Sequence, residues 1–107
     1  MFFQTLARTG FVAACAFAAT LLPASAADVS NGKRIAERWC ATCHVVTPEQ
    51  TRASADAPTF AAIATKYASS KELGVFLTDP HPRMPDMALS QPEIADIVAY
   101  IRSLGPQ

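Results

Sequence analysis

The sequence contains few of the residues that build most metal and redox sites. It has three cysteines and two histidines among 107 residues. A structural zinc site needs about four ligands. After the N-terminal segment only Cys40, Cys43, His44 and His81 are available, and the usual second pair of cysteines or histidines is missing. Blocks of like charge are also missing, which argues against nucleic acid as a partner.

No apolar run in the chain is long enough to cross a bilayer comfortably. The longest, Gly10 to Leu22, has 13 residues, whereas a helical span needs about 20. A single basic residue, Arg8, precedes this run, and Pro23 interrupts it. Ala24-Ser25-Ala26 follows, which is the small-x-small pattern that signal peptidase reads. This arrangement is typical of a secretory signal peptide.

The sequence therefore predicts two parts, a cleaved signal peptide over 1–26 and a mature domain over 27–107 that is exported to the periplasm without a stable membrane anchor. Cleavage after Ala27, an uncleaved anchor, and a lipoprotein processed at Cys15 are the alternatives. A mature chain this short cannot build a large core, and domains below about 80 residues usually depend on a disulfide, a metal or another staple.

The segment Cys40-Ala41-Thr42-Cys43-His44 supplies such a staple. Cys-x-x-Cys-His is the attachment signature of haem c. The two cysteine thiols add across the two vinyl groups of the haem, and two intervening residues keep both sulfurs near one edge of the macrocycle. The adjacent histidine then brings its imidazole to the iron. We therefore predict one covalent haem on Cys40 and Cys43, with His44 as an iron ligand.

Three other interpretations of the two cysteines are possible. They could form a disulfide, because the predicted compartment is oxidising. A thioredoxin-like dithiol would need a βαβ framework, and the sequence shows no convincing strands. Zinc would need further ligands. The position of the motif shortly after an export signal favours haem.

Four short helices are predicted, and no strands. The last is the clearest, because Ser90-Gln91-Pro92-Glu93 forms a capping box and Gly105-Pro106 ends the helix. Its apolar stripe consists of Ile94, Ile97, Val98, Ile101 and Leu104, with Tyr100 beside it. The other three helices are expected at Ser30–Ala41, Phe60–Ala68 and Lys71–Thr78, separated by loops over 45–57 and 79–87.

The first three helices also carry apolar residues. In the first, Gly32, Ile35, Ala36 and Trp39 recur at helical spacing. A glycine inside a helix is costly unless another element comes close. In the second, Phe60, Ile63, Ala64 and Tyr67 fall on one side, and in the third, Leu73, Val75, Phe76 and Leu77 are apolar.

The second axial ligand is expected from the proline-rich loop, where His81, Met84 and Met87 are the candidates. A thioether is neutral and soft, so it stabilises ferrous iron and raises the reduction potential. Met84 is preferred because Pro85 follows it in a stiff loop. Met87 stands just before the last helix, where an apolar residue often packs as a hydrophobic staple.

These motifs resemble those of small bacterial class I cytochromes c over essentially all of 27–107. The resemblance rests on Asn31–Ala36, Trp39–His44, Ala57–Phe60, Met84-Pro85 and the last helix. It implies an all-α cytochrome c-like fold around one haem, with the first and last helices crossing near Gly32 and Tyr100. It also implies that the Pro58 carbonyl accepts a hydrogen bond from His44 Nδ1–H. The loop over 45–57 varies in length within the family.

The predicted function is that of a monomeric, non-enzymatic carrier of single electrons between a dehydrogenase or reductase and an oxidase or other acceptor. Two filled axial positions would leave no place for a substrate at the iron. One alternative is a permanent haem subunit of a dehydrogenase or oxidase, which a large apolar surface patch would favour. Another is a peroxidase or gas sensor, which needs an open iron site.

Overall fold

The structure is a computed structural model that describes residues 10, 13–19, 26–67, 69–79 and 84–106. Most of the predicted signal peptide therefore lies outside the described residues, as does His81 of the proline-rich loop. The described residues before Asp28 are exposed and form no helix. In the described part of the chain, no helix is both long enough and apolar enough to cross a membrane.

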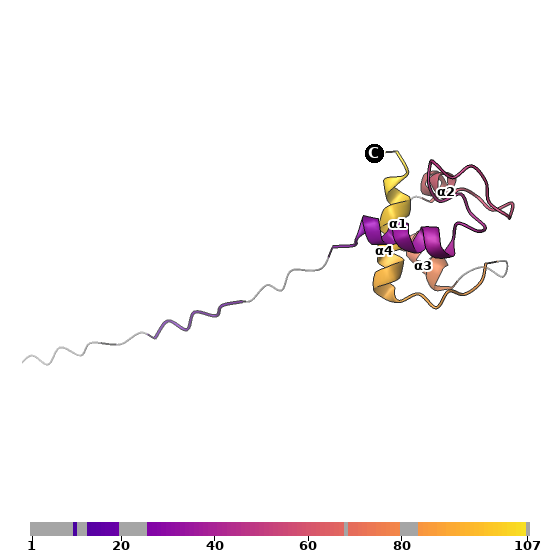
Figure 1. Cartoon of the computed structure of the whole chain (residues 1–107). Helices are drawn as coiled ribbons and strands as arrows, with labels where there is room; N and C mark the ends of the chain where they lie inside the picture. Colours follow the sequence, from indigo (N-terminus) through magenta and orange to yellow (C-terminus); the bar gives the residue numbers. More distant parts are fainter. Residues whose placement is uncertain (1–9, 11–12, 20–25, 68, 80–83, 107) are drawn as a thin grey trace, which may run out of the picture.

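The described residues contain four helices and no strand, which confirms the all-α prediction (Figure 1). Each helix begins at a side chain that accepts a hydrogen bond from a backbone N–H of the first turn. Such caps satisfy groups that have no partner within the helix. The helices are α1 (Val29–Trp39), α2 (Phe60–Lys66), α3 (Ser70–Thr78) and α4 (Gln91–Ser103).

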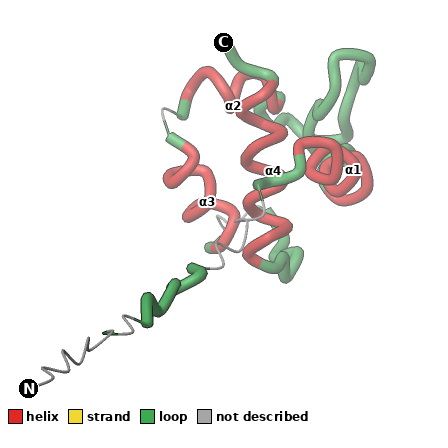
Figure 2. The backbone as a smooth tube through the Cα atoms, turned by 90° about the vertical axis from the view of Figure 1, so that its left-hand side faces the viewer, coloured by secondary structure: helices red, strands yellow, loops and turns green. Residues whose placement is uncertain are grey.

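The central helix is α4, which contacts each of the other three. Figure 2 shows α1 and α3 on opposite sides of α4, with α2 near its C-terminal end. The predicted capping box is present, with Ser90 as the N-cap and Glu93 as its partner. This box holds the start of α4 in place against the loop that precedes it.

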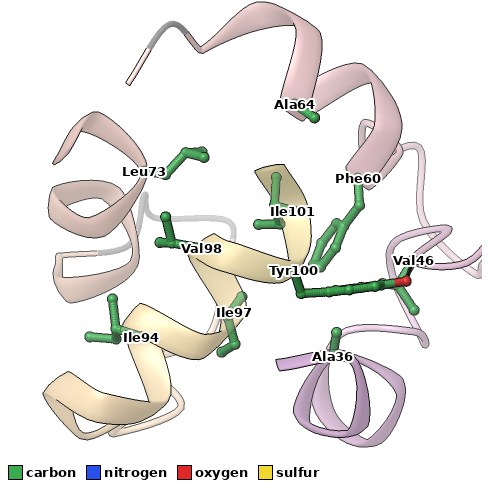
Figure 3. Close-up of a cluster of buried hydrophobic side chains, with 10 residues drawn as sticks. All are labelled: Ala36, Val46, Phe60, Ala64, Leu73, Ile94, Ile97, Val98, Tyr100 and Ile101. Atoms are coloured by element: carbon green, nitrogen blue, oxygen red, sulfur yellow. Dashed lines mark hydrogen bonds between the residues drawn. The ribbon is translucent and has the colours of Figure 1, made fainter. Parts of the chain in front are cut away.

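A single cluster of ten buried apolar residues forms the core, and half of them come from α4 (Figure 3). The α4 residues face α3 through Leu73, α1 through Ala36, and α2 through Phe60 and Ala64. Its members are Ala36, Val46, Phe60, Ala64, Leu73, Ile94, Ile97, Val98, Tyr100 and Ile101.

Helices α1 and α4 approach each other closely at Gly32. A Cβ atom at this position would lie 2.0 Å from the backbone oxygen of Asp96 and 2.9 Å from Tyr100 Cβ. The predicted crossing near Gly32 and Tyr100 is therefore present. Asp96 also accepts hydrogen bonds from the backbone N–H of Asp28, at 2.7 Å, and from Asn31 Nδ2, at 2.8 Å. The start of α1 is thus tied to α4.

Two apolar residues of these helices, Trp39 and Val75, are exposed. Trp39 keeps 50% of its surface exposed, and the Arg38 guanidinium lies over its ring at 5.1 Å from the centroid. Val75 is 62% exposed on α3. Both side chains lie on the outer side of their helices, because the buried surfaces are centred on Gly32 and Ala36 in α1 and on Leu73 in α3.

Candidate functional site

The Cys40–His44 segment forms a tight turn directly after α1. Cys40 is the C-cap of the helix, and its N–H donates to the Ala36 carbonyl. The N–H groups of Cys43 and His44 both donate to the Cys40 carbonyl, at 3.1 and 2.9 Å. Cys40 is half-buried and packs against the core cluster, whereas Cys43 is exposed. The turn therefore anchors one sulfur on the protein and leaves the other at the surface.

Cys40 and Cys43 are not joined by a disulfide. Burial, and to a smaller extent the neighbouring Cys43, raises the pKa of Cys40 to about 11. In the described part of the chain, no three His, Cys, Asp or Glu side chains come together as a metal site.

The His44 ring is held by the loop that precedes α2. Its Nδ1 atom lies 2.6 Å from the Pro58 carbonyl oxygen, which is the contact that the resemblance implies. Because a carbonyl can only accept, the bond places the proton on Nδ1 and leaves the lone pair on Nε2. The Phe60 ring packs beside the imidazole, with 5.5 Å between the centroids. The imidazole is thus fixed in tautomer and in position.

The segment around Pro58 is itself fixed where it enters α2. Thr59 caps α2 by accepting from the Ala62 N–H, and the Phe60 N–H donates to the Val45 carbonyl at 2.9 Å. The carbonyl of buried Val46 accepts from the Tyr100 hydroxyl of α4 (Figure 3). The backbone that follows His44 is therefore hydrogen-bonded to the start of α2 and to α4.

Met84 and Met87 are both partly buried and lie outside regular secondary structure. Neither is among the described side chains that pack against the core cluster. The N-cap of α4 is Ser90, so the residue in the staple position is Leu89, which does pack against the core. The suggested staple role of Met87 is therefore wrong, because Met87 stands two residues too early.

A further residue of this region was not apparent from the sequence. The side-chain amide of Gln50 donates to the carbonyl oxygens of Ala41 and His44, at 2.8 and 2.9 Å. Gln50 lies in the irregular loop over 45–57, where no periodicity or capping pattern marks it. Its contacts depend on how this loop folds back on the Cys40–His44 turn.

Comparison with known proteins places this chain in a family. Residues 27–101 match the family described as cytochrome c oxidase, cbb3-type, subunit III. Cytochrome c-552 of Bradyrhizobium diazoefficiens is 49% identical over 98 residues, which cover 91% of this chain and 94% of that protein. No solved structure matches the chain. The chain belongs to this family and is a small bacterial c-type cytochrome.

The cofactor of such a protein is covalent haem c, which supplies an iron that accepts and releases one electron. The described residues fit this group. Two cysteines with two residues between them can supply the sulfurs that add to its vinyl groups, and the adjacent imidazole keeps the Nε2 lone pair that a metal ligand needs. The chain is accordingly a monohaem electron-transfer protein.

Proposed function

We propose that the chain is an exported, periplasmic carrier of single electrons, with haem bound through Cys40 and Cys43 and iron held by His44 and Met84. The observation that carries the proposal is the His44 imidazole, which is held at Nδ1 by the Pro58 carbonyl and directly follows Cys43 of the Cys-x-x-Cys pair. A ring held in this way presents one defined nitrogen to the iron.

The His44–Pro58 hydrogen bond has two effects on the proposed ligand. It fixes the plane of the ring, and it increases the electron density on the imidazole, as hydrogen bonds to ligating histidines do. The packing of Phe60 against the same ring limits its rotation further. A ligand that moves little between oxidation states keeps the reorganisation small, which suits a protein that only transfers electrons.

For the second ligand we propose Met84. Both methionines are partly buried without joining the core cluster, so burial does not distinguish them. The order of residues favours Met84, because Pro85 follows it and because the resemblance places the ligand in a Met-Pro pair. Met87 adjoins Ala88, whose backbone is held at φ 50° in a turn closed by Asp86.

We also propose export with cleavage after Ala26, or after Ala27. The apolar run and the Ala24-Ser25-Ala26 pattern support it. Ala26 and Ala27 are exposed and precede the first helix, so removal of the segment before them leaves α1 and its cap at Asp28 intact. The mature domain then begins at the edge of the folded part of the chain.

A permanent oxidase subunit is the second candidate, because the matching family is described by that name. Two observations favour a free carrier. The match covers 94% of cytochrome c-552, so the domain makes up nearly all of that relative. The large apolar side chains exposed on the described helices are few, namely Val29 and Trp39 at the two ends of α1 and Val75 on α3. They offer little surface for an obligate interface.

The test of the attachment site uses protein that is expressed with a c-type maturation system. Its intact mass should equal the chain from Ala27 or Asp28 plus one haem, and the haem should resist acid–acetone extraction. The double variant Cys40→Ala, Cys43→Ala should release the haem and lose most of its helical circular dichroism. A colourless wild-type product would exclude the proposed function.

The test of the ligand compares Met84→Ala with Met87→Ala as the matched control. The ferric wild type should show the weak far-red band of a sulfur–iron bond. Met84→Ala should lose the band, lower the reduction potential and bind carbon monoxide when reduced, while Met87→Ala keeps the band. If Met87→Ala loses the band and Met84→Ala keeps it, Met87 is the ligand. If both variants keep the band, His81 becomes the candidate.

A further inference from the structure

One side chain, Gln50, connects the two ends of the Cys40–His44 turn. Its Nε2 atom donates to the carbonyl oxygens of Ala41, His44 and Arg52, at 2.8, 2.9 and 3.1 Å. Its Oε1 atom accepts from the Val46 backbone N–H at 2.9 Å. A single amide group therefore bonds to the backbone on both sides of the turn.

The orientation of this amide follows from its partners. Three carbonyl oxygens surround one end of the group and a backbone N–H meets the other. If oxygen and nitrogen exchanged places, an acceptor would face three acceptors and a donor would face a donor. These partners therefore require an amide in this orientation, because a carboxylate or an apolar group cannot donate to the carbonyl oxygens.

The hydrogen bonds inside the turn are of a different kind. The N–H groups of Cys43 and His44 reach back to the Cys40 carbonyl, so they close the turn locally. Ser54 adds a backbone and a side-chain donor to the Thr42 carbonyl, both at 2.7 Å. Gln50 acts at two further carbonyls of the turn, those of Ala41 and His44, and fixes their separation.

We propose that Gln50 is a positioning residue for the haem attachment turn, an inference that rests on the proposed function. It acts through the His44 backbone, because the carbonyl that it binds belongs to the residue that carries the imidazole. The Pro58 carbonyl fixes the ring from the side-chain end, and Gln50 fixes the same residue from the backbone end. Together they set where Nε2 lies relative to the two thiols.

The experiment compares Gln50→Met with Gln50→Glu in protein made with a c-type maturation system. Methionine has a similar length and makes none of the four bonds. Glutamate has the same shape and keeps the oxygen that meets Val46, but it places a second oxygen against the carbonyls of Ala41 and His44. Gln91→Met is the matched control for the chemical change, because the Gln91 side chain is exposed on the first turn of α4.

Three quantities are measured: the fraction of chains that carry haem, the reduction potential, and the paramagnetically shifted proton resonances of the His44 ring. Both Gln50 variants should lose attached haem and move the His44 resonances and the potential away from the wild-type values. Leu73→Ala controls for stability alone. This buried α3 residue should lower the melting temperature but leave the resonances and the potential in place.

Wild-type resonances, potential and haem content in both Gln50 variants would overturn the inference, and so would equal shifts in Leu73→Ala. If Gln50→Met fails to fold, Gln50→Asn takes its place, since a chain one methylene shorter cannot reach both carbonyls. The proposed function fails separately, by the absence of covalent haem from the wild-type protein. A haem-loaded wild type with unaffected Gln50 variants refutes only the role of Gln50.

Discussion

Replacing Gly32 by alanine tests the crossing of α1 and α4. The new Cβ atom would lie 2.0 Å from the Asp96 carbonyl oxygen, 2.5 Å from its carbonyl carbon and 2.9 Å from Tyr100 Cβ. Ordinary contacts between such atoms are about 3.5 Å or longer. Two of the three contacts are with helix backbone, which cannot turn aside as a flexible side chain does. The two helices must therefore move apart by about 1.5 Å at this point.

The free-energy cost combines two effects of opposite sign. Forcing an extra carbon into a packed site costs about 1–3 kcal/mol, and a backbone contact of this closeness belongs at the upper end. Alanine has a higher helix propensity than glycine, which stabilises the folded protein by about 1 kcal/mol. We expect a net loss of about 2 kcal/mol, which lowers the melting temperature of a domain of this size by roughly 10 °C.

The assay is thermal unfolding of the haem-loaded protein followed by circular dichroism, with Gly74→Ala as the matched control. Gly74 lies inside α3, and nothing would lie within 4 Å of a Cβ atom there. The same substitution should therefore stabilise the protein at Gly74, by about 1 kcal/mol. A Gly32→Ala protein that melts at or above the wild-type temperature would refute the close crossing of α1 and α4.

Three further predictions concern stability. Hydrogen bonds from Asn31 and from the backbone before α1 lower the pKa of Asp96. The stabilising effect of the Asp96 carboxylate is therefore present above the unfolded pKa of about 3.9 and is lost as the pH falls through the lower folded pKa. In an acid titration followed by circular dichroism, the Asp96→Asn protein should lose less stability over this pH range than the wild type. Tyr100→Phe should cost about 1–3 kcal/mol in thermal unfolding, because the buried Val46 carbonyl loses its donor, and an unchanged melting temperature would contradict this. Ala88→Gly should stabilise by about 0.5–1 kcal/mol, because glycine accepts φ 50° without the steric cost that alanine bears, and a lower melting temperature would count against strain there.

The helices could be predicted from the sequence because each begins with its own cap. The Ser90 and Glu93 pair is a local signal, and the structure shows both of its hydrogen bonds. The predicted C-terminal ends of the helices were less accurate. The first helix was expected to reach Ala41 but ends at Trp39, because Cys40 begins the turn, and the second was expected to reach Ala68 but ends at Lys66, because Tyr67 is extended.

The parts of the site that were not predicted depend on contacts between distant segments. Helical spacing placed Trp39 on the apolar face, but spacing does not say where the neighbouring helix ends. Gln50 acts through carbonyl oxygens of the Cys40–His44 turn, and its sequence neighbours give no sign of this. The Pro58 contact was available only through the resemblance, since the loop between the two residues has no regular structure.

The α1–α4 interface also bears on when the chain can fold. It is the most extensive contact between helices in the described structure, and it joins the two ends of the domain. With 11 residues, α1 is too short to be stable alone in water, where about 12–15 residues are already marginal. A chain that is still being synthesised lacks α4 and so cannot retain its first helix. The domain can therefore fold only after the C-terminal residues that form α4 have been synthesised.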